Sequence, residues 1–269
     1  MNGMEIAVPG HFGEFLQGRI GPGGPVALVT LPCPALRARA LRLPGPFALH
    51  QPGVRVLSRA GAAGLLRSLG VRPEGRFSLR LDMPAGGGAG ASTAARVALA
   101  RAAGVTDPEA IALACLGSEG AVDPLMLDDP GRLLWASRAG RVLARLPAPP
   151  RMEIVGGFFG PMRRTDPADA AFPDIADLSD AWPAACGDLA GVAALASESA
   201  RRTIRLRGPA DDPTETLAAT TGALGFVIAH TGAARGLIFA PGTVPETTPA
   251  ALRAAGFRHI LRFRIGGGR

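Results

Sequence analysis

A glycine-rich segment at residues 84–95 carries the strongest chemical signal in the 269-residue chain. It reads PAGGGAGASTAA and stands between an alternating apolar segment and an alanine-rich one. Glycine lets the backbone approach a ligand closely and adopt positive φ, and the unpaired amides of a helix start attract anions. The segment therefore predicts a phosphate-binding loop that needs no lysine. The residues expected to form it are Pro84, Gly86, Gly87, Gly88, Ala89, Gly90, Ala91 and Ser92.

The chain contains no lysine, since all 29 of its basic residues are arginine. A lysine-dependent P-loop, a Schiff-base enzyme and a Ser-Lys hydrolase are therefore excluded. A protein-kinase fold would lack the lysine that clamps its nucleotide. Asparagine occurs once, glutamine twice and tyrosine not at all, a usage that indicates a GC-rich genome.

The net charge of +7 and the isoelectric point near 11.1 are weak evidence for nucleic-acid binding. Arginine titrates far above lysine and inflates the isoelectric point. The arginines are dispersed, with no run longer than two, and the chain lacks aromatic stacking platforms. We therefore expect no nucleic-acid partner.

The cysteines, Cys33, Cys115 and Cys186, lie far apart and form no CxxC pair. Their odd number argues against a disulfide framework and a zinc site. The N-terminus does not read as a signal peptide, and the longest uncharged run, 216–234, is interrupted by Thr, Gly and His230. We expect a cytoplasmic protein without a membrane partner, and the sequence leaves its oligomeric state open.

The second half of the chain alternates strands and helices. Strands are predicted at 153–159, 225–230, 237–240 and 261–265, and helices at 188–202, from a cap at 212–215, and at 248–256. This order, β-α-(α)-β-β-α-β, is ferredoxin-like with one extra helix.

The first half is predicted to be α+β. Strands are expected at 4–8, 26–31, 36–41 and 76–82, and helices at 92–103 and 107–117, while 44–75 gives no clear pattern. A proline-rich stretch at 146–150 is the expected seam between an N-terminal domain, 1–150, and a C-terminal domain, 151–269.

Several short segments carry a resemblance to a known family. The glycine loop is similar to the nucleotide loop of the GHMP kinases, and residues 8–18, VPGHFGEFLQG, are similar to the N-terminal motif of the bacterial L-threonine kinase branch. Residues 229–238, AHTGAARGLI, and the helix at 194–202 resemble later motifs of that branch. The segments keep the family order across residues 8–239.

The resemblance implies a fold and an activity. The fold would pair an N-terminal domain like domain 2 of ribosomal protein S5 with a C-terminal ferredoxin-like domain. The activity would be phosphorylation of the hydroxyl of L-threonine to O-phospho-L-threonine, feeding the aminopropanol arm of cobalamin synthesis. ATP and Mg²⁺ would be the cofactors.

The resemblance also implies site residues. The loop would bind ATP, Ser92 and Glu119 would bind Mg²⁺, and Asp123 and Glu14 would be catalytic. The expected substrate-binding residues are Glu14, Gly13, His230 and Thr231. The Asp123 segment is offset from the branch pattern, with Pro124 after the acid. His11 stands where the branch has threonine and receives little weight.

Three hypotheses remain open at this point. The first is a small-molecule kinase acting on threonine, with homoserine or another small alcohol as rival substrate. The second is a ligand-binding protein of the same fold without phosphotransfer, motivated by the altered Asp123 segment and by Ala91 in place of the loop's first serine. The third, based on charge alone, is a nucleic-acid-binding protein.

Overall fold

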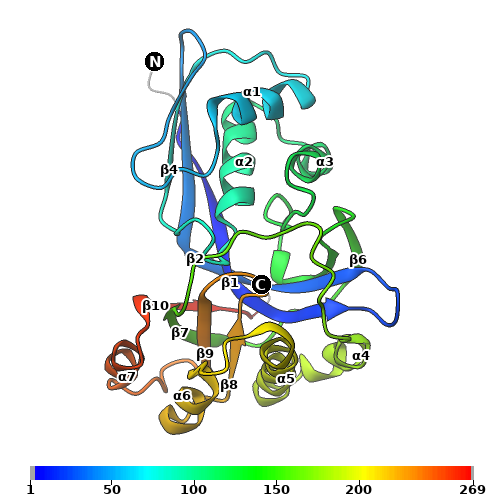
Figure 1. Ribbon diagram of the computed structural model, residues 1–269, viewed down its shortest axis with the longest axis vertical. Helices are drawn as coiled ribbons and strands as arrows, with labels where there is room; N and C mark the ends of the chain where they lie inside the picture. The colour runs from blue at the N-terminus through cyan, green and yellow to red at the C-terminus, as the bar shows by residue number, and fades with distance from the viewer. Residues whose placement is uncertain (1–3, 268–269) are drawn as a thin grey trace.

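The computed structural model describes residues 4–267 and contains one large mixed sheet with helices packed against it (Figure 1). The strands run in the order β10-β7-β9-β8-β1-β2-β4-β3, and a hairpin of β5 and β6 joins through β2. The strands are β1 (Ile6–Arg19), β2 (Val26–Leu43), β3 (Ala48–His50), β4 (Arg76–Leu81), β5 (Leu133–Ala136), β6 (Arg141–Arg145), β7 (Met152–Phe158), β8 (Gly225–Ile228), β9 (Ala234–Phe239) and β10 (Arg258–Ile265). The helices are α1 (Arg59–Ser68), α2 (Ala91–Ala102), α3 (Pro108–Glu119), α4 (Ala176–Ala185), α5 (Leu189–Arg207), α6 (Thr214–Thr221) and α7 (Thr248–Ala254), with a 3₁₀ turn, η1 (Pro130–Arg132).

The long antiparallel pair of β1 and β2 forms the spine of the molecule (Figure 1). Short strands were predicted at 4–8, 26–31 and 36–41, and these boundaries were wrong. β1 continues through Pro9-Gly10 to Arg19, and β2 runs without a break across Pro32 and Pro34. Register shifts, one of them between Pro9 and Gly10, let β1 continue past residues that usually end pairing.

The second half has the predicted ferredoxin-like order. The fully antiparallel sheet β10-β7-β9-β8 corresponds to the strand order 4-1-3-2 of that pattern. The sequence prediction for this half missed α4, which contains Pro183, and placed the N-cap of α6 one residue early. The N-cap residue is Pro213, whose side chain cannot cap, and Asp212 makes the capping contact by accepting from the amide of Thr214 at 3.0 Å.

Four more helices and strands were not predicted, namely α1, β3, β5 and β6. α1 lies in the stretch 44–75, where the hydroxyl of Ser58 caps it by accepting from the amide of Gly61. The hairpin of β5 and β6 extends the sheet beside β2.

None of the helices within residues 4–267 is long and apolar enough to cross a membrane.

The two halves share a sheet and a core. β1 pairs with β8 where Glu14 lies opposite Ile228. Phe12 of β1 is fully buried and meets Phe158 of β7 and Phe263 of β10 edge-on, at ring-centroid distances of 5.4 and 5.9 Å. β1 therefore connects the parts of the sheet that carry the two sequence halves.

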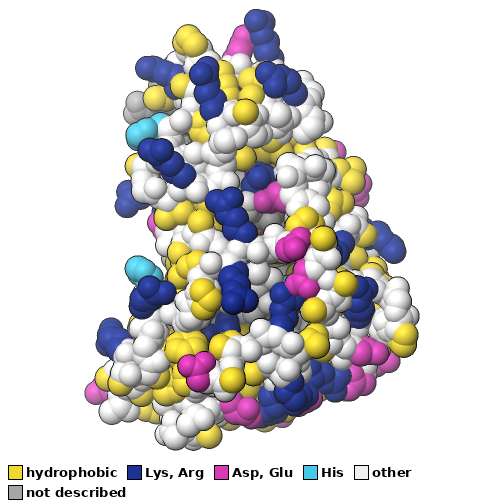
Figure 2. Space-filling model, viewed as in Figure 1, with side chains coloured by type: hydrophobic (Ala, Val, Ile, Leu, Met, Phe, Trp, Pro, Cys, Tyr) yellow, Lys and Arg dark blue, Asp and Glu magenta, His cyan; other side chains and the backbone are white. Residues whose placement is uncertain are grey.

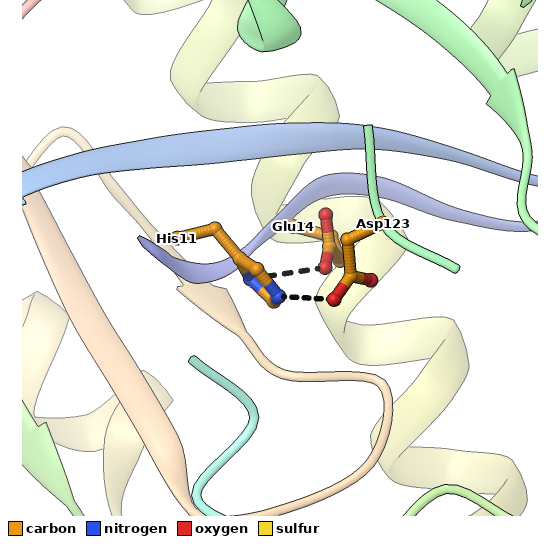
Figure 3. Close-up of side chains that lie close together, drawn as sticks. All are labelled: His11, Glu14 and Asp123. Atoms are coloured by element: carbon orange, nitrogen blue, oxygen red, sulfur yellow. Dashed lines mark ion pairs between the residues drawn. The ribbon is translucent and has the colours of Figure 1, made fainter. Parts of the chain in front are cut away.

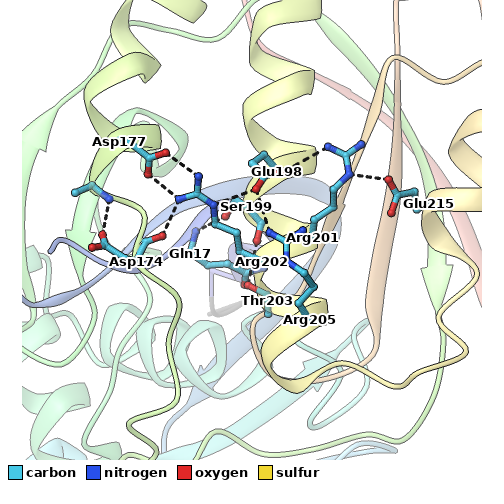
Figure 4. Close-up of polar contacts among 11 residues, drawn as sticks. Gln17, Asp174, Asp177, Glu198, Ser199, Arg201, Arg202, Thr203, Arg205 and Glu215 are labelled. Atoms are coloured by element: carbon cyan, nitrogen blue, oxygen red, sulfur yellow. Dashed lines mark hydrogen bonds and ion pairs between the residues drawn. The ribbon is translucent and has the colours of Figure 1, made fainter. Parts of the chain in front are cut away.

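A polar network fixes α5 against the chain that precedes it (Figure 4). Arg202 forms two hydrogen bonds to Asp177, at 2.6 and 2.7 Å, and one to the carbonyl of Asp174 at 2.8 Å. The amide of Gln17 in β1 donates to the hydroxyl of Ser199 at 3.0 Å. These bonds secure the end of the irregular segment 159–175, which borders the cavity described below.

Candidate functional site

The glycine loop joins β4 to the start of α2. Gly86, Gly88 and Gly90 have φ of +73°, +73° and +69°, a region that residues with a side chain rarely adopt. Gly90 is the N-cap of α2 and provides no side-chain cap. The first amides of α2 therefore have no capping side chain and stay available to an anion.

The loop is held by backbone contacts from both halves of the chain. The amides of Ala233 and Ala234 donate to the carbonyl of Gly87, at 3.0 and 2.8 Å. The amide of Gly13 donates to Gly88 at 3.3 Å, and that of His11 donates to Ala89 at the same distance. The 229–238 motif thus serves to position the glycine loop.

A cavity of about 350 Å³ opens beside this loop. The predicted site residues that line it are His230, Thr231, Glu14, Gly86, Gly87, Gly88, Ala89, Gly90, Ala91, Ser92, Glu119 and Asp123. Two others do not line it. Pro84 closes the turn of the loop by accepting from the amide of Gly87, and Gly13, at φ +77°, lies against the backbone of Ile228.

Three ionisable side chains that line the cavity lie close together (Figure 3). His11 Nδ1 lies 3.3 Å from Glu14 Oε1, and His11 Nε2 lies 3.4 Å from Asp123 Oδ2. The side chains of His11 and Glu14 are 6% and 4% exposed, and that of Asp123 is 25% exposed. An imidazole therefore sits between two carboxylates in a site largely closed to water.

Local irregularity in β1 makes this cluster possible. Residues three apart in a regular strand point to opposite faces of the sheet. Register shifts between His11 and Glu14, together with the left-handed Gly13, bring both side chains to one side. Asp123 arrives from the loop after α3, where Trp135 donates to the carbonyl of Val122 at 2.6 Å.

The cluster shifts the titration of its members. Burial would lower the pKa of His11, but Glu14 and Asp123 outweigh it and raise that pKa to about 9. Burial raises the pKa of Glu14 to about 7 against the attraction of His11. Burial would also raise the pKa of Asp123, but His11 holds it below its usual value. Asp123 is thus the carboxylate of the cluster that stays ionised most readily.

Ser92 and Glu119 lie in contact at the N-terminal end of α2. The hydroxyl of Ser92 donates to Glu119 Oε1, and Arg96 bridges both residues, at 2.6 Å from Ser92 Oγ and 3.0 Å from Glu119 Oε1. Burial raises the pKa of Glu119 against the charge of Arg96. Glu119 Oε2 is buried without a hydrogen-bond partner. This pair of hard oxygen donors fits Mg²⁺.

Arginines form much of the cavity wall. Arg96, Arg138, Arg163 and Arg164 all line it. Figure 2 shows basic and acidic side chains around the hollow in the middle of this face. An arginine-lined wall next to an open helix start suits a polyanionic ligand.

His230 lines the cavity as a neutral imidazole. Loss of solvent contact and the neighbouring Arg207 lower its pKa to about 3. Its ring stacks on Phe172 at 4.0 Å and 4°, and its Nε2 lies 2.7 Å from Arg207. Arg138 in turn binds the carbonyls of Asp166, Pro167 and Asp169. His230 thus forms a neutral wall with the segment 159–175.

Sequence reasoning gave too little weight to His11 and missed the wall residues. His11 occurs within the quoted motif at 8–18, so its place next to a conformationally special Pro-Gly pair was a signal. Arg96 follows Ser92 by one helical turn, which puts both on the same face of α2. Phe172, Arg163 and Arg164 lie in an irregular segment that no sequence pattern marks.

Comparisons with known proteins bear on the fold. No protein-family model matches the sequence, and no curated protein matches it either. Among solved structures, the Leishmania major mevalonate kinase in complex with R-mevalonate matches with a TM-score of 0.66 and 16% identity, covering 97% of this chain and 95% of that one. A putative homoserine kinase from Listeria monocytogenes matches with a TM-score of 0.64 and 16% identity, covering 97% and 96%.

A third solved structure also matches over the whole fold. A 4-(cytidine 5'-diphospho)-2C-methyl-D-erythritol kinase matches with a TM-score of 0.59 and 23% identity, covering 98% of this chain and all of that one. These matches span nearly the whole of each chain. The protein therefore has the α+β fold of the GHMP kinases, as the sequence analysis expected.

Proposed function

We propose that this protein is an ATP-dependent kinase that phosphorylates the hydroxyl of a small amino acid, with L-threonine as its substrate. One observation carries the proposal. The glycine loop, with the uncapped start of α2, opens on the same cavity as the buried carboxylate of Glu14 and the partly exposed carboxylate of Asp123. An anion site and an acceptor site in one cavity are what phosphoryl transfer requires, since its catalysis is mainly positioning and charge stabilisation.

The donor end is assigned to the glycine loop and its surroundings. The amides between Gly86 and Ser92, with Arg163 and Arg164, would hold the phosphates. Ser92 and Glu119 would hold the metal, with Arg96 keeping both in place. ATP with Mg²⁺, when bound, supplies the phosphoryl group and neutralises charge on the phosphates.

The acceptor end is assigned to the acidic cluster. Asp123, ionised and partly exposed, accepts the hydroxyl proton at the carboxylate oxygen that His11 does not hold. Glu14 has a buried oxygen, Oε2, without a hydrogen-bond partner. A buried acceptor without a donor is costly, so an ammonium group of the substrate would find its partner there. Threonine carries both groups.

Threonine itself is supported by the sequence resemblance to the L-threonine kinase branch, which would place the product in the aminopropanol arm of cobalamin synthesis. The matched solved structures are named as mevalonate, homoserine and CDP-methylerythritol kinases. Homoserine is the closest chemical rival, because it has the same charged groups and a primary hydroxyl. The kcat/KM values of two substrates that differ by one methylene group usually differ by only about 10–200-fold.

The deciding experiment is ADP release from the purified protein with ATP and Mg²⁺, run in parallel with L-threonine, L-homoserine and L-serine. We expect threonine to give the highest kcat/KM and phosphothreonine to be detected by mass spectrometry. A preference for homoserine would keep the kinase and replace the substrate. ATP binding without turnover on any of them would favour a ligand-binding protein of this fold, and absence of ATP binding would overturn the proposal.

A further inference from the structure

The acceptor end of the cavity contains two carboxylates and needs a fixed cation. Glu14 and Asp123 would repel each other in a site closed to water, and either would tend to take up a proton. Lysine, the usual compact cation for such a place, is absent from the chain. A cation that the chain itself supplies here is therefore an arginine or a protonated histidine.

His11 has the geometry for that task. Its two ring nitrogens face different carboxylates, Nδ1 toward Glu14 at 3.3 Å and Nε2 toward Asp123 at 3.4 Å. A neutral imidazole has one donor nitrogen and one acceptor, whereas both nitrogens donate in the imidazolium. Since ionised Asp123 only accepts, Nε2 donates to it, while Nδ1 is buried without a hydrogen-bond partner and faces Glu14 as a close charge contact. A proton on each nitrogen, as in the imidazolium, fits this arrangement.

Within residues 4–267, Glu14 and Asp123 are the charged groups that act on His11. Three uncharged residues surround it. Pro32 of β2 lies opposite it in the sheet, and Ala89 and Gly90 contact it from the glycine loop. Arg96 is engaged with Ser92 and Glu119. His230, on the opposite wall near Asp123, has its pKa lowered and is neutral at pH 7. The charge state of His11 is thus governed by Glu14 and Asp123.

The position of the ring also links the two ends of the site. A Cβ built on Gly90 would lie 2.6 Å from His11 Cδ2, so the ring packs directly against the N-cap of α2. His11 therefore stands between the acceptor carboxylates and the place where the anion would bind. A cation at this point can hold the carboxylates and lower the repulsion between them and an incoming phosphate.

We propose that His11 is the positioning cation of the acceptor end: a buried imidazolium that holds Asp123 and Glu14 in place and keeps Asp123 ionised for the hydroxyl of the substrate. The catalytic part of this inference rests on the proposed function. Its structural part, the charge and contacts of His11, does not.

The structural part is tested first by following the imidazole resonances of the apo protein through a pH titration by NMR, in the presence of a chelator. His11 is assigned with His11→Gln. We expect its resonance to stay that of an imidazolium through neutral pH and to titrate near pH 9. Glu14→Gln and Asp123→Asn should each move that midpoint down. A midpoint at or below the ordinary value of 6.5 would overturn the proposal.

The same three side chains are close enough to hold a metal, since one ligand atom from each lies within 4.8 Å of the others. Zn²⁺ is the probe for this alternative, because imidazole with carboxylates suits it. Stoichiometric Zn²⁺ binding that displaces the His11 proton at neutral pH, and that His11→Gln abolishes, would make the cluster a metal site and overturn the cation assignment.

The catalytic part is tested by the pH profile of kcat/KM for wild type, His11→Gln and His11→Lys. We expect His11→Gln to lose on the order of 10²-fold. We expect His11→Lys to recover much of this loss and to move the alkaline limb to higher pH, because lysine titrates near 10.4. His259→Asn, an exposed histidine outside the cavity whose left-handed backbone asparagine tolerates, is the control and should match wild type.

The outcomes separate the two proposals. A folded His11→Gln with wild-type kcat/KM and an unchanged alkaline limb would reduce His11 to a packing residue. A folded His11→Lys as inactive as His11→Gln would show that charge is not its contribution. A wild type without activity on any alcohol, but with a His11 midpoint near pH 9, would overturn the proposed function and leave the charge assignment standing.

Discussion

At the scale of single residues, the site depends on pairs of side chains that neutralise one another. Glu119 is held by Ser92 and Arg96, while Glu14 and Asp123 share His11. Each carboxylate is removed from water and therefore needs its partner. Removing one member leaves the other charged or orphaned, so the effects of substitutions should reach beyond the residue changed.

The metal assignment predicts the behaviour of two variants. Ser92→Ala and Glu119→Gln should each lower kcat by on the order of 10² or more, because each removes an oxygen that would hold Mg²⁺. Circular dichroism should show an unchanged fold. Glu109→Gln, an exposed acid at the other end of α3, is the matched control and should keep wild-type kcat. Near-normal turnover in both site variants would refute the assignment.

The charge of His11 predicts how stability depends on pH. Its folded pKa of about 9 lies above the ordinary 6.5, so its contribution to stability is complete below about pH 6.5 and is lost as pH rises through 9. Wild type should therefore lose on the order of 1–3 kcal/mol more than His11→Gln between pH 7 and pH 9.5. Urea unfolding at both pH values measures this difference. An equal loss in both proteins would contradict it.

At the scale of elements, the glycine loop is shaped by how closely two backbones approach. Gly88 combines φ of +73° with a position where a Cβ would collide with Ala229 and the carbonyl of Thr231. Gly232, on the opposing segment, would meet the loop in the same way. The contact between the two segments therefore requires glycine at both positions, whether or not the loop binds a phosphate.

A glycine in this contact and a glycine in open space should respond to substitution by alanine in opposite ways. Gly88→Ala should destabilise the protein by about 1–3 kcal/mol, because it adds strain and a collision. Gly64→Ala, in the exposed face of α1 with open space around it, should stabilise by about 0.5–1 kcal/mol. Chemical denaturation measures both. A Gly88→Ala protein as stable as wild type would show that the loop shifts freely.

At the scale of the whole molecule, the sheet makes the two sequence halves one structure. β1 pairs with β2 on one side and with β8 on the other, and Phe12 joins the core across the boundary. The cavity lies where the halves meet, with the glycine loop from one and the segment 229–231 from the other. A working site therefore requires both halves to be folded.

This continuity predicts coincident unfolding of the two halves. Trp135 lies in β5 and Trp182 in α4, and both are fully buried. Trp182→Phe leaves a reporter in the first half, and Trp135→Phe leaves one in the second. Fluorescence of each variant should give the same denaturation midpoint as the circular dichroism of that same variant. Separated midpoints within one variant would show that the halves unfold independently.

The sequence by itself determined the features that local physics controls. The glycine loop, the start of α2 and the order of strands in the second half follow from residue types at short spacing, whereas the pairing of Ser92 with Glu119 came only from the family resemblance. Glycine conformations, caps and apolar periodicity act over a few residues, so they can be recognised without the fold.

Only the tertiary structure decided how the acceptor end is built. His11 and Glu14 should point to opposite faces of a regular strand, and the register shifts of β1 against β2 bring them together. Asp123 joins them from more than 100 residues away, and Phe172, Arg163 and Arg164 come from the irregular segment 159–175. Such contacts depend on long-range pairing and on bulges whose positions are set by the partner strand, and local sequence carries no record of them.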